Sequence, residues 1–206
     1  MTKNGIDVSY AQNNVDWQKV KASGIDFAIV RVGWCYNNGA LKEDVHFKKH
    51  ISGALAAGLD VGVYLYSYAT TAEAARRAAK EVIEAVKPYK LSYPIAFDIE
   101  YESIYTGGSK QVNTDICKAF LDEIEAGYYA MLYCSKDFLD TYLDHFEAAG
   151  YDIQTNSSRQ LNWERAKQEE WFYDDHNKTP ILHLNAPNQP TVAKAVVESI
   201  KDYFRK

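Results

Sequence analysis

The chain alternates between short apolar runs and longer stretches in which apolar residues recur every three or four positions. Each apolar run has the length of a buried strand, and each periodic stretch has the pattern of a helix with one apolar face. A strand followed by a helix, repeated along the chain, is typical of a parallel sheet covered by helices. Strands are predicted at residues 5–9, 27–32, 61–68, 94–100 and 128–133, and helices at 15–21, 44–57, 72–86, 113–126 and 136–146.

Five successive strand-helix units predict an α/β fold, either a barrel or a doubly wound sheet. After Gly150 the alternation weakens, with short apolar runs at 171–173 and 181–184 and a last predicted helix at 192–204. We expect this region to close the same domain irregularly. Because 206 residues suffice for one sizeable core, we expect a single domain over residues 1–206.

Charge and composition narrow the possible partners. The 23 basic and 28 acidic residues give a net charge of -5, and no dense Lys/Arg block is present, so nucleic acid is not an expected partner. No run approaches the roughly 20 apolar residues that cross a bilayer, and the first residues lack the apolar stretch of a signal peptide. We therefore expect a soluble monomer without membrane contact or a signal peptide in this chain.

The cysteines point to packing rather than chemistry. Cys35, Cys117 and Cys134 are an odd number at wide, irregular spacing, which fits neither a disulfide framework nor a paired zinc motif. We expect all three to be small buried hydrophobes.

Two carboxylates stand at the carboxyl end of a strand that is otherwise apolar, in Phe97-Asp98-Ile99-Glu100. Side chains alternate along a strand, so Asp98 and Glu100 share a face with their α-carbons roughly 6.5 Å apart. Two acids so close repel each other when both are ionised, so one is expected to hold its proton to a higher pH than in water. One protonated and one ionised carboxyl are what glycoside cleavage requires.

A D-x-E pattern taken alone also fits an acid that caps a helix or pairs with an arginine. Asp7 changes this balance, because it too lies in an apolar strand and can project into the same barrel mouth. Three acids from two strands could instead hold Ca²⁺ or Mg²⁺. No D-x-D-x-D-G loop surrounds them and their neighbours are aromatic, so we expect no metal.

Aromatic residues accompany the acids. Tyr64, Tyr66 and Tyr68 alternate onto one face of the third strand, where Tyr64 and Tyr66 fit a sugar groove as well as they fit a core. Trp17 is expected in the core, whereas Trp34 fits the core and a sugar-stacking platform equally. The sequence holds no G-x-S-x-G, H-E-x-x-H or phosphate-binding glycine loop, which leaves serine-hydrolase, zinc-protease and nucleotide-binding functions without support.

Several of these blocks together resemble one known family. Gly5-Ile6-Asp7-Val8-Ser9 with Gln12, followed by Val15-Asp16-Trp17, resembles the opening motif of the glycoside hydrolase family 25 lysozymes, the Chalaropsis-type muramidases. The blocks at 27–31, 62–68 and 94–100 resemble the family's next strands in the right order, and 127–135 is similar to its fifth strand. The resemblance covers residues 4 to 145.

This resemblance implies a modified (β/α) TIM-like barrel, no cofactor, and a place outside the cell or in the cell wall. It implies hydrolysis of the β-1,4 bond between N-acetylmuramic acid and N-acetylglucosamine in peptidoglycan. Glu100 would be the general acid, Asp98 would stabilise the transition state directly or by orienting the substrate's acetamide, and Asp7 would complete the acidic mouth. The substrate-binding residues would be Tyr64, Tyr66, Tyr133, Arg31 and His183.

The C-terminal third departs from the family pattern. The family's tryptophan is missing from Tyr151-Asp152-Ile153-Gln154. The family's W-Q-Y block is replaced by Trp171-Phe172-Tyr173, and its V-D-x-N block by Leu182-His183-Leu184-Asn185, with His183 in place of the acid. These changes bear on turnover and substrate choice more than on the fold. Two other functions therefore stay open: a wall-binding module with weak or no turnover, and a glycosidase for another N-acetylated glycan such as chitin.

Overall fold

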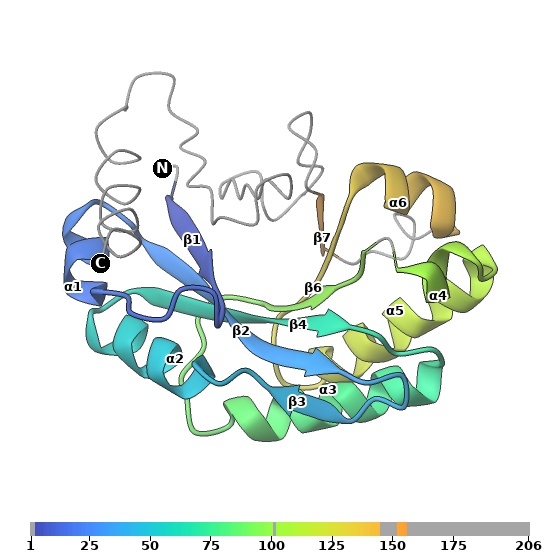
Figure 1. Cartoon of the computed structure of the whole chain (residues 1–206), viewed down its shortest axis with the longest axis horizontal. Helices are drawn as coiled ribbons and strands as arrows, with labels where there is room; N and C mark the ends of the chain where they lie inside the picture. The colour runs from blue at the N-terminus through green and yellow to red at the C-terminus, as the bar shows by residue number, and fades with distance from the viewer. Residues whose placement is uncertain (1–2, 101, 145–151, 156–206) are drawn as a thin grey trace.

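The computed structural model describes residues 3–100, 102–144 and 152–155 (Figure 1). Its described strands form one sheet in the order β1-β2-β4-β5-β6-β7, with every neighbouring pair parallel, while β3 pairs antiparallel with β2. In chain order the elements are β1 (Gly5–Val8), α1 (Trp17–Ala22), β2 (Phe27–Cys35), β3 (Leu41–Glu43), α2 (Phe47–Ala56), β4 (Asp60–Ser67), α3 (Ala72–Val86), β5 (Ile95–Asp98), α4 (Ser103–Thr106), α5 (Lys110–Glu125), β6 (Ala130–Cys134), α6 (Lys136–Tyr142) and β7 (Asp152–Thr155).

This arrangement confirms the predicted α/β class, a mostly parallel sheet with flanking helices. All five predicted strand-helix units are present, with bounds that shift by a few residues. The predicted helix at 192–204, the apolar runs at 171–173 and 181–184, and any closure of a barrel by them lie outside the described residues.

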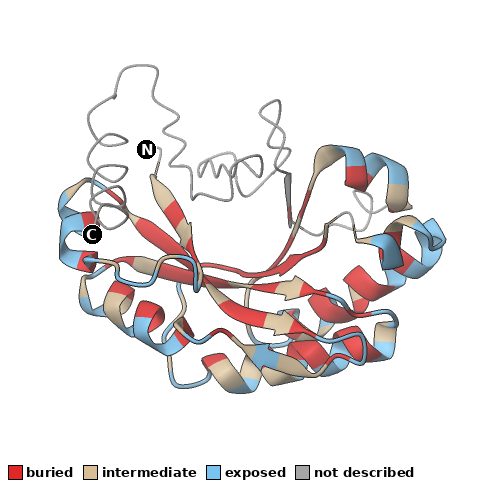
Figure 2. Ribbon diagram, viewed as in Figure 1, coloured by how far each residue is buried: buried red, intermediate tan, exposed pale blue. Residues whose placement is uncertain are grey.

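The two faces of the sheet have different coverings. On the outer face, alternate side chains of every strand from β1 to β6 pack against helices, and α2, α3 and α5 lie together on this side (Figure 1). Figure 2 shows that these helices turn buried residues towards the sheet and exposed residues away from it. The opposite, inner face carries a small apolar cluster of Phe27, Ile29, Tyr93, Ala96 and Met131.

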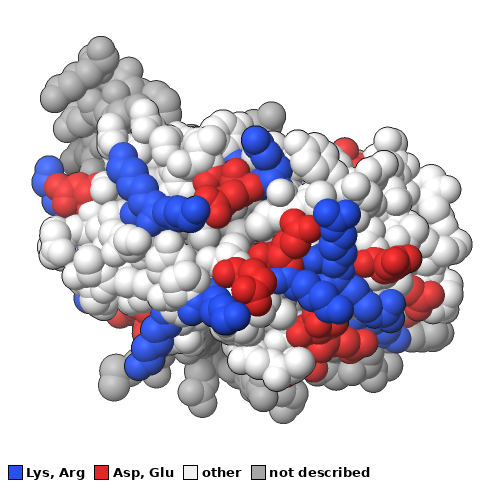
Figure 3. Space-filling model, turned by 90° about the horizontal axis from the view of Figure 1, so that it is seen from below, with Lys and Arg blue, Asp and Glu red and all other residues white. Residues whose placement is uncertain are grey.

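The outer core also settles several sequence expectations. Trp17 is buried, with its indole edge against His50. Cys35, Cys117 and Cys134 are all buried free thiols, as expected. Seen from below, over the helical layer, basic and acidic side chains are interspersed (Figure 3).

Four elements differ from the sequence prediction. Helix α2 begins at Phe47 rather than Asp44, because the Asp44 carboxylate is engaged elsewhere. Helix α6 ends at Tyr142, since Leu143 is extended, with φ -114° and ψ 153°. The short strand β3 and the single-turn helix α4 were not predicted, because neither is long enough to show a periodic pattern.

A β-bulge in β2 decides which face receives Trp34. The register of β2 with β4 shifts between Arg31 and Gly33, so that Arg31 pairs with Tyr64 while Trp34 pairs with Tyr66. In a regular strand Trp34, three positions after Arg31, would point to the opposite face. The extra residue of the bulge returns Trp34 to the inner face. Trp34 is therefore half-buried on the same face as Arg31 rather than in the outer core.

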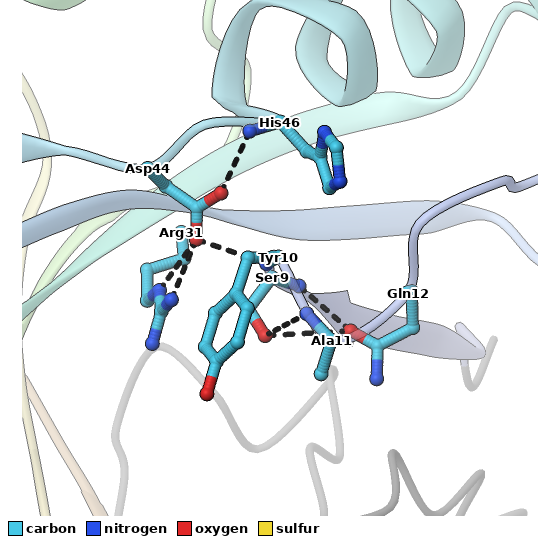
Figure 4. A network of polar contacts seen from close by, with 7 residues as sticks. All are labelled: Ser9, Tyr10, Ala11, Gln12, Arg31, Asp44 and His46. Carbon is cyan, nitrogen blue, oxygen red and sulfur yellow. Dashed lines mark hydrogen bonds and ion pairs between the residues drawn. The ribbon is translucent and has the colours of Figure 1, made fainter.

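One buried carboxylate ties three chain segments together (Figure 4). Asp44 is 2% exposed, and its Oδ2 accepts from Arg31 Nε at 2.7 Å and from the Tyr10 backbone N–H at 2.9 Å. Arg31 Nη2 lies 2.7 Å from the same oxygen, and Oδ1 accepts from the His46 backbone N–H at 2.9 Å. Asp44 thus fixes the loop after β1, the middle of β2 and the start of α2.

We predict that Asp44→Asn destabilises the fold strongly. The substitution keeps the size of the side chain but leaves the mostly buried Arg31 guanidinium without its counter-charge, so urea denaturation should show a loss of about 3 kcal/mol in the free energy of unfolding. Asp140→Asn is the control, because its pair with Lys136 is solvent-exposed and should be worth less than about 0.5 kcal/mol. Equal losses in the two variants would contradict the role given to Asp44.

A second prediction concerns the contact between α1 and α2. A Cβ at Gly53 would lie 2.3 Å from Trp17 Cδ1, so Gly53→Ala should lower the melting temperature. This clash should outweigh the higher helix propensity of alanine, which stabilises a helix by about 1 kcal/mol relative to glycine. Ser52→Ala, at the exposed neighbouring position of α2, gains helix propensity without this clash and should not lower it. Thermal unfolding followed by circular dichroism compares the two; a stabilised Gly53→Ala variant would show that the packing is loose.

Candidate active site

A row of polar side chains crosses the carboxyl ends of three neighbouring strands on the inner face. Tyr66 of β4 is in register with Asp98 of β5, and Asp98 is in register with Tyr133 of β6. Paired residues of a parallel ladder point to the same face, so the three side chains stand side by side. Asp98 is 7% exposed, which places a carboxyl group in a largely desolvated position at the end of its strand.

Glu100 lies two residues beyond Asp98 and meets the same tyrosine. The Tyr66 hydroxyl contacts Glu100 Oε2 at 3.4 Å and donates to Glu102 Oε1 at 2.8 Å. Burial, followed by the charge of Glu100 and the hydrogen bond to Glu102, raises the pKa of Tyr66 far above its usual range, so its hydroxyl remains a proton donor. Tyr66 therefore contacts two acids of one short segment, and it is in register with a third, Asp98.

The backbone after β5 is held by hydrogen bonds to both neighbouring strands, β6 and β4. The Ile99 N–H donates to the Tyr133 carbonyl at 3.0 Å, which continues the pairing with β6 beyond Asp98. The fully buried Tyr105 hydroxyl is hydrogen-bonded to Ser67 Oγ at 2.9 Å, and the Asn113 side chain donates to the Tyr105 carbonyl at 3.0 Å. The segment that carries the acids thus packs onto the end of β4.

Arg31 and Tyr64 occupy the next row of the inner face, where they are in register. The Arg31 guanidinium is stacked 4.6 Å from the centre of the exposed Tyr10 ring and 5.7 Å from that of Trp34. Its side chain is 14% exposed. Aromatic rings and a fixed cation therefore adjoin the row of polar side chains formed by Tyr66, Asp98 and Tyr133.

Asp7 is on the same face but at the far end of the described sheet order. It is in register with Ile29, which belongs to the inner apolar cluster, and β2 and β4 lie between β1 and β5. Burial raises the pKa of Asp7 to about 6, against 3.8 for an ordinary aspartate, and a hydrogen bond with its own backbone offsets part of that effect. This carboxyl group is suited to holding a proton in mildly acidic solution.

The structure thus brings Asp98, Glu100, Tyr66 and Tyr133 into one neighbourhood and places Tyr64, Arg31 and Asp7 on the same face of the sheet. His183 lies outside the described residues. Sequence reasoning missed Glu102. The spacing Asp98, Glu100, Glu102 was its only signal, and it was not followed because the strand was expected to end at Glu100.

The described residues offer neither a metal site nor a membrane-spanning helix. They contain no group of three or more His, Cys, Asp or Glu side chains arranged to hold a metal ion. Nor does any helix among them have the length and apolar character needed to span a bilayer.

Comparison with solved structures finds relatives of the same fold. The modular autolysin LytC from Streptococcus pneumoniae, solved in complex with a synthetic peptidoglycan ligand, is 30% identical with a TM-score of 0.65, over 79% of this chain and 39% of that one. A family 25 glycosyl hydrolase from Bacillus anthracis is 21% identical with a TM-score of 0.65, over 82% and 76% of the two chains. A family GH25 lysozyme from Aspergillus fumigatus is 20% identical with a TM-score of 0.63, over 79% and 83%.

These matches differ in extent. The chain spans about two fifths of the length of the autolysin, whereas it covers most of the other two proteins, whose likeness shows a shared fold. A search of curated proteins finds no match. The family model of the glycosyl hydrolases family 25 matches residues 6–180, far more than half of the sequence. The chain therefore belongs to glycosyl hydrolases family 25.

Proposed function

We propose that the protein is a lysozyme that hydrolyses the β-1,4 bond between N-acetylmuramic acid and N-acetylglucosamine in peptidoglycan. The observation that carries this proposal is the pair Asp98 and Glu100 at the carboxyl edge of a parallel sheet, in a chain that the family 25 model matches over residues 6–180. The peptidoglycan ligand bound to the related autolysin supports the choice of substrate.

Glu100 is the general acid in this proposal. A protonated carboxyl is needed to give its proton to the departing glycosidic oxygen as the bond breaks. Glu100 is half-buried beside the Tyr66 hydroxyl, which can hold its carboxyl in place.

Asp98 is the ionised partner. Its carboxylate stabilises the positive charge that develops on the sugar ring, either directly or by orienting the acetamide of the substrate as an internal nucleophile. The largely buried position of Asp98 supports this role, because a fixed charge acts more strongly where water is excluded.

Substrate binding is assigned to the remaining inner-face side chains. The rings of Tyr64, Tyr66 and Tyr133 offer apolar faces and hydroxyl groups to a sugar, and Arg31 offers hydrogen-bond donors to an acidic substituent. The same assignment is extended to His183. Asp7 completes the acidic set on this face.

The proposal also covers the setting of the enzyme. It acts as a monomer, through a single catalytic domain over residues 1–206, on the cell wall or outside the cell. The related autolysin, which was solved with a synthetic peptidoglycan ligand, supports this location.

The first test is digestion of purified peptidoglycan sacculi, followed by mass spectrometry of the products. The wild-type protein should release muropeptides with N-acetylmuramic acid at the new reducing end, and Glu100→Gln should lower the rate by about 10²- to 10⁴-fold through loss of the general acid. Glu125→Gln, on the exposed surface of α5, is the matched control and should retain the wild-type rate.

Other outcomes of this digestion decide against the proposal. Binding to sacculi without any muropeptide release would identify a wall-binding module. Faster cleavage of chitin oligomers than of sacculi would identify a different glycosidase. Full activity in Glu100→Gln would remove the assigned general acid.

The raised pKa of Asp7 gives a prediction about stability. The native protein holds this proton more tightly than the unfolded chain, so the stabilisation is complete below pH 3.8 and is lost as the pH rises through about 6. Asp7→Asn stays neutral throughout. Urea denaturation at several pH values should therefore show the wild-type free energy of unfolding falling relative to that of Asp7→Asn across this window, and a difference that does not change with pH would refute the assignment.

A further inference from the structure

Tyr66 contacts two carboxylates but has one hydroxyl proton to give. The contact with Glu102 Oε1 is 2.8 Å, the usual length of an O–H···O hydrogen bond, whereas that with Glu100 Oε2 is 3.4 Å. The proton therefore lies towards Glu102. The lone pairs of the Tyr66 oxygen are then left facing Glu100.

The backbone around Glu102 explains why its carboxylate is available to Tyr66. Glu102 is the N-cap of α4, but its side chain makes no hydrogen bond to that helix. Its N–H donates to the Glu100 carbonyl at 2.8 Å and its carbonyl accepts from the Tyr105 N–H at 2.9 Å, so the residue is fixed by its main chain. The side chain is left to reach across to β4.

Glu102 and Tyr105 contact opposite faces of the sheet at the carboxyl end of β4. Tyr66 on the inner face contacts Glu102, while the next residue, Ser67, bonds to Tyr105 on the outer face. The chain from Glu102 to Tyr105 is therefore hydrogen-bonded to β4 on both faces of the sheet. This makes the separation between Tyr66 and Glu102 a fixed property of the fold.

We propose that Glu102 is a positioning residue: by accepting a hydrogen bond from the Tyr66 hydroxyl it leaves the Tyr66 oxygen as an acceptor for Glu100, which favours the protonated Glu100 that a general acid requires. The negative charge of Glu102 acts in the same direction, because a second anion nearby disfavours ionisation of Glu100. This inference rests on the role proposed above for Glu100.

Other charged and titratable groups share this environment. Asp98 acts on the cluster through its charge, and Tyr68, whose ring lies 5.2 Å from that of Tyr66, is hydrogen-bonded to the Tyr66 side chain. Tyr133 of β6 is beside Asp98, and the charge of Arg31 reaches Tyr68. All of these stay unchanged in the variants below, so differences between variants report on Glu102 and Tyr66.

The test is a double-mutant cycle of Glu102→Ser and Tyr66→Phe. Serine is too short to reach Tyr66 but is favoured at a helix N-cap, so α4 should be retained. The readout is the pH midpoint of the Glu100 side-chain carboxyl, followed by carbon-13 NMR without substrate and assigned by its loss in Glu100→Gln. Circular dichroism checks the fold of each variant, and Glu102→Ala replaces the serine variant if that one is unfolded.

Glu102→Ser should lower the Glu100 midpoint by about one pH unit, because it removes a negative charge and frees the Tyr66 proton for Glu100. With Phe at position 66 the same substitution removes the charge alone, so the shift should be about half as large. Equal shifts in the two backgrounds, or no shift at all, would overturn the proposal. Glu125→Ser on the outer helix α5 is the control and should leave the midpoint in place.

Activity gives a separate readout. In the wild-type protein the alkaline limb of muropeptide release should follow the Glu100 midpoint, and in Glu102→Ser it should move to lower pH by the same amount. If the wild-type protein releases no muropeptides, the proposed function fails while the NMR cycle still reports on Glu102. If it is active and the limb stays where it was in Glu102→Ser, the inference fails and the proposed function stands.

Discussion

Successive side chains of a strand point to opposite faces of the sheet, and this constraint places the strand residues of the site, Tyr66, Asp98 and Tyr133, on the inner face. Along β5, Ile95 and Phe97 pack into the outer core, with the Phe97 ring stacked 4.3 Å from that of Phe120 on α5. Ala96 and Asp98 must then face inward. Because the helices fix the outer set of residues, they also fix the inner set, which includes the acids.

The sequence was sufficient for those parts of the fold that this alternation governs. Apolar runs located the strands, and the alanine-rich stretch located α3. The same alternation predicted one face for Asp98 and Glu100 and one face for Tyr64 and Tyr66, and the register of β4 with β5 makes Tyr66 and Asp98 neighbours. Local periodicity is a reliable guide where one face of an element is buried.

The sequence was insufficient where a side chain depends on a residue distant along the chain. Asp44 resembled the start of a helix, but its carboxylate is committed to Arg31 on another strand. The bulge that returns Trp34 to the inner face has no pattern of its own in β2. Glu102 and Tyr66 are 36 residues apart, and they meet through the pairing of β5 with β4 and the packing of Tyr105 against Ser67.

The three buried cysteines have a consequence for the surroundings that the protein tolerates. Burial raises the pKa of the thiols of Cys35, Cys117 and Cys134, so each remains protonated at neutral pH. Oxidants and disulfides react with the thiolate form, which these residues do not supply. The described part of the fold can therefore pass from a reducing compartment to an oxidising one without a change in its covalent structure.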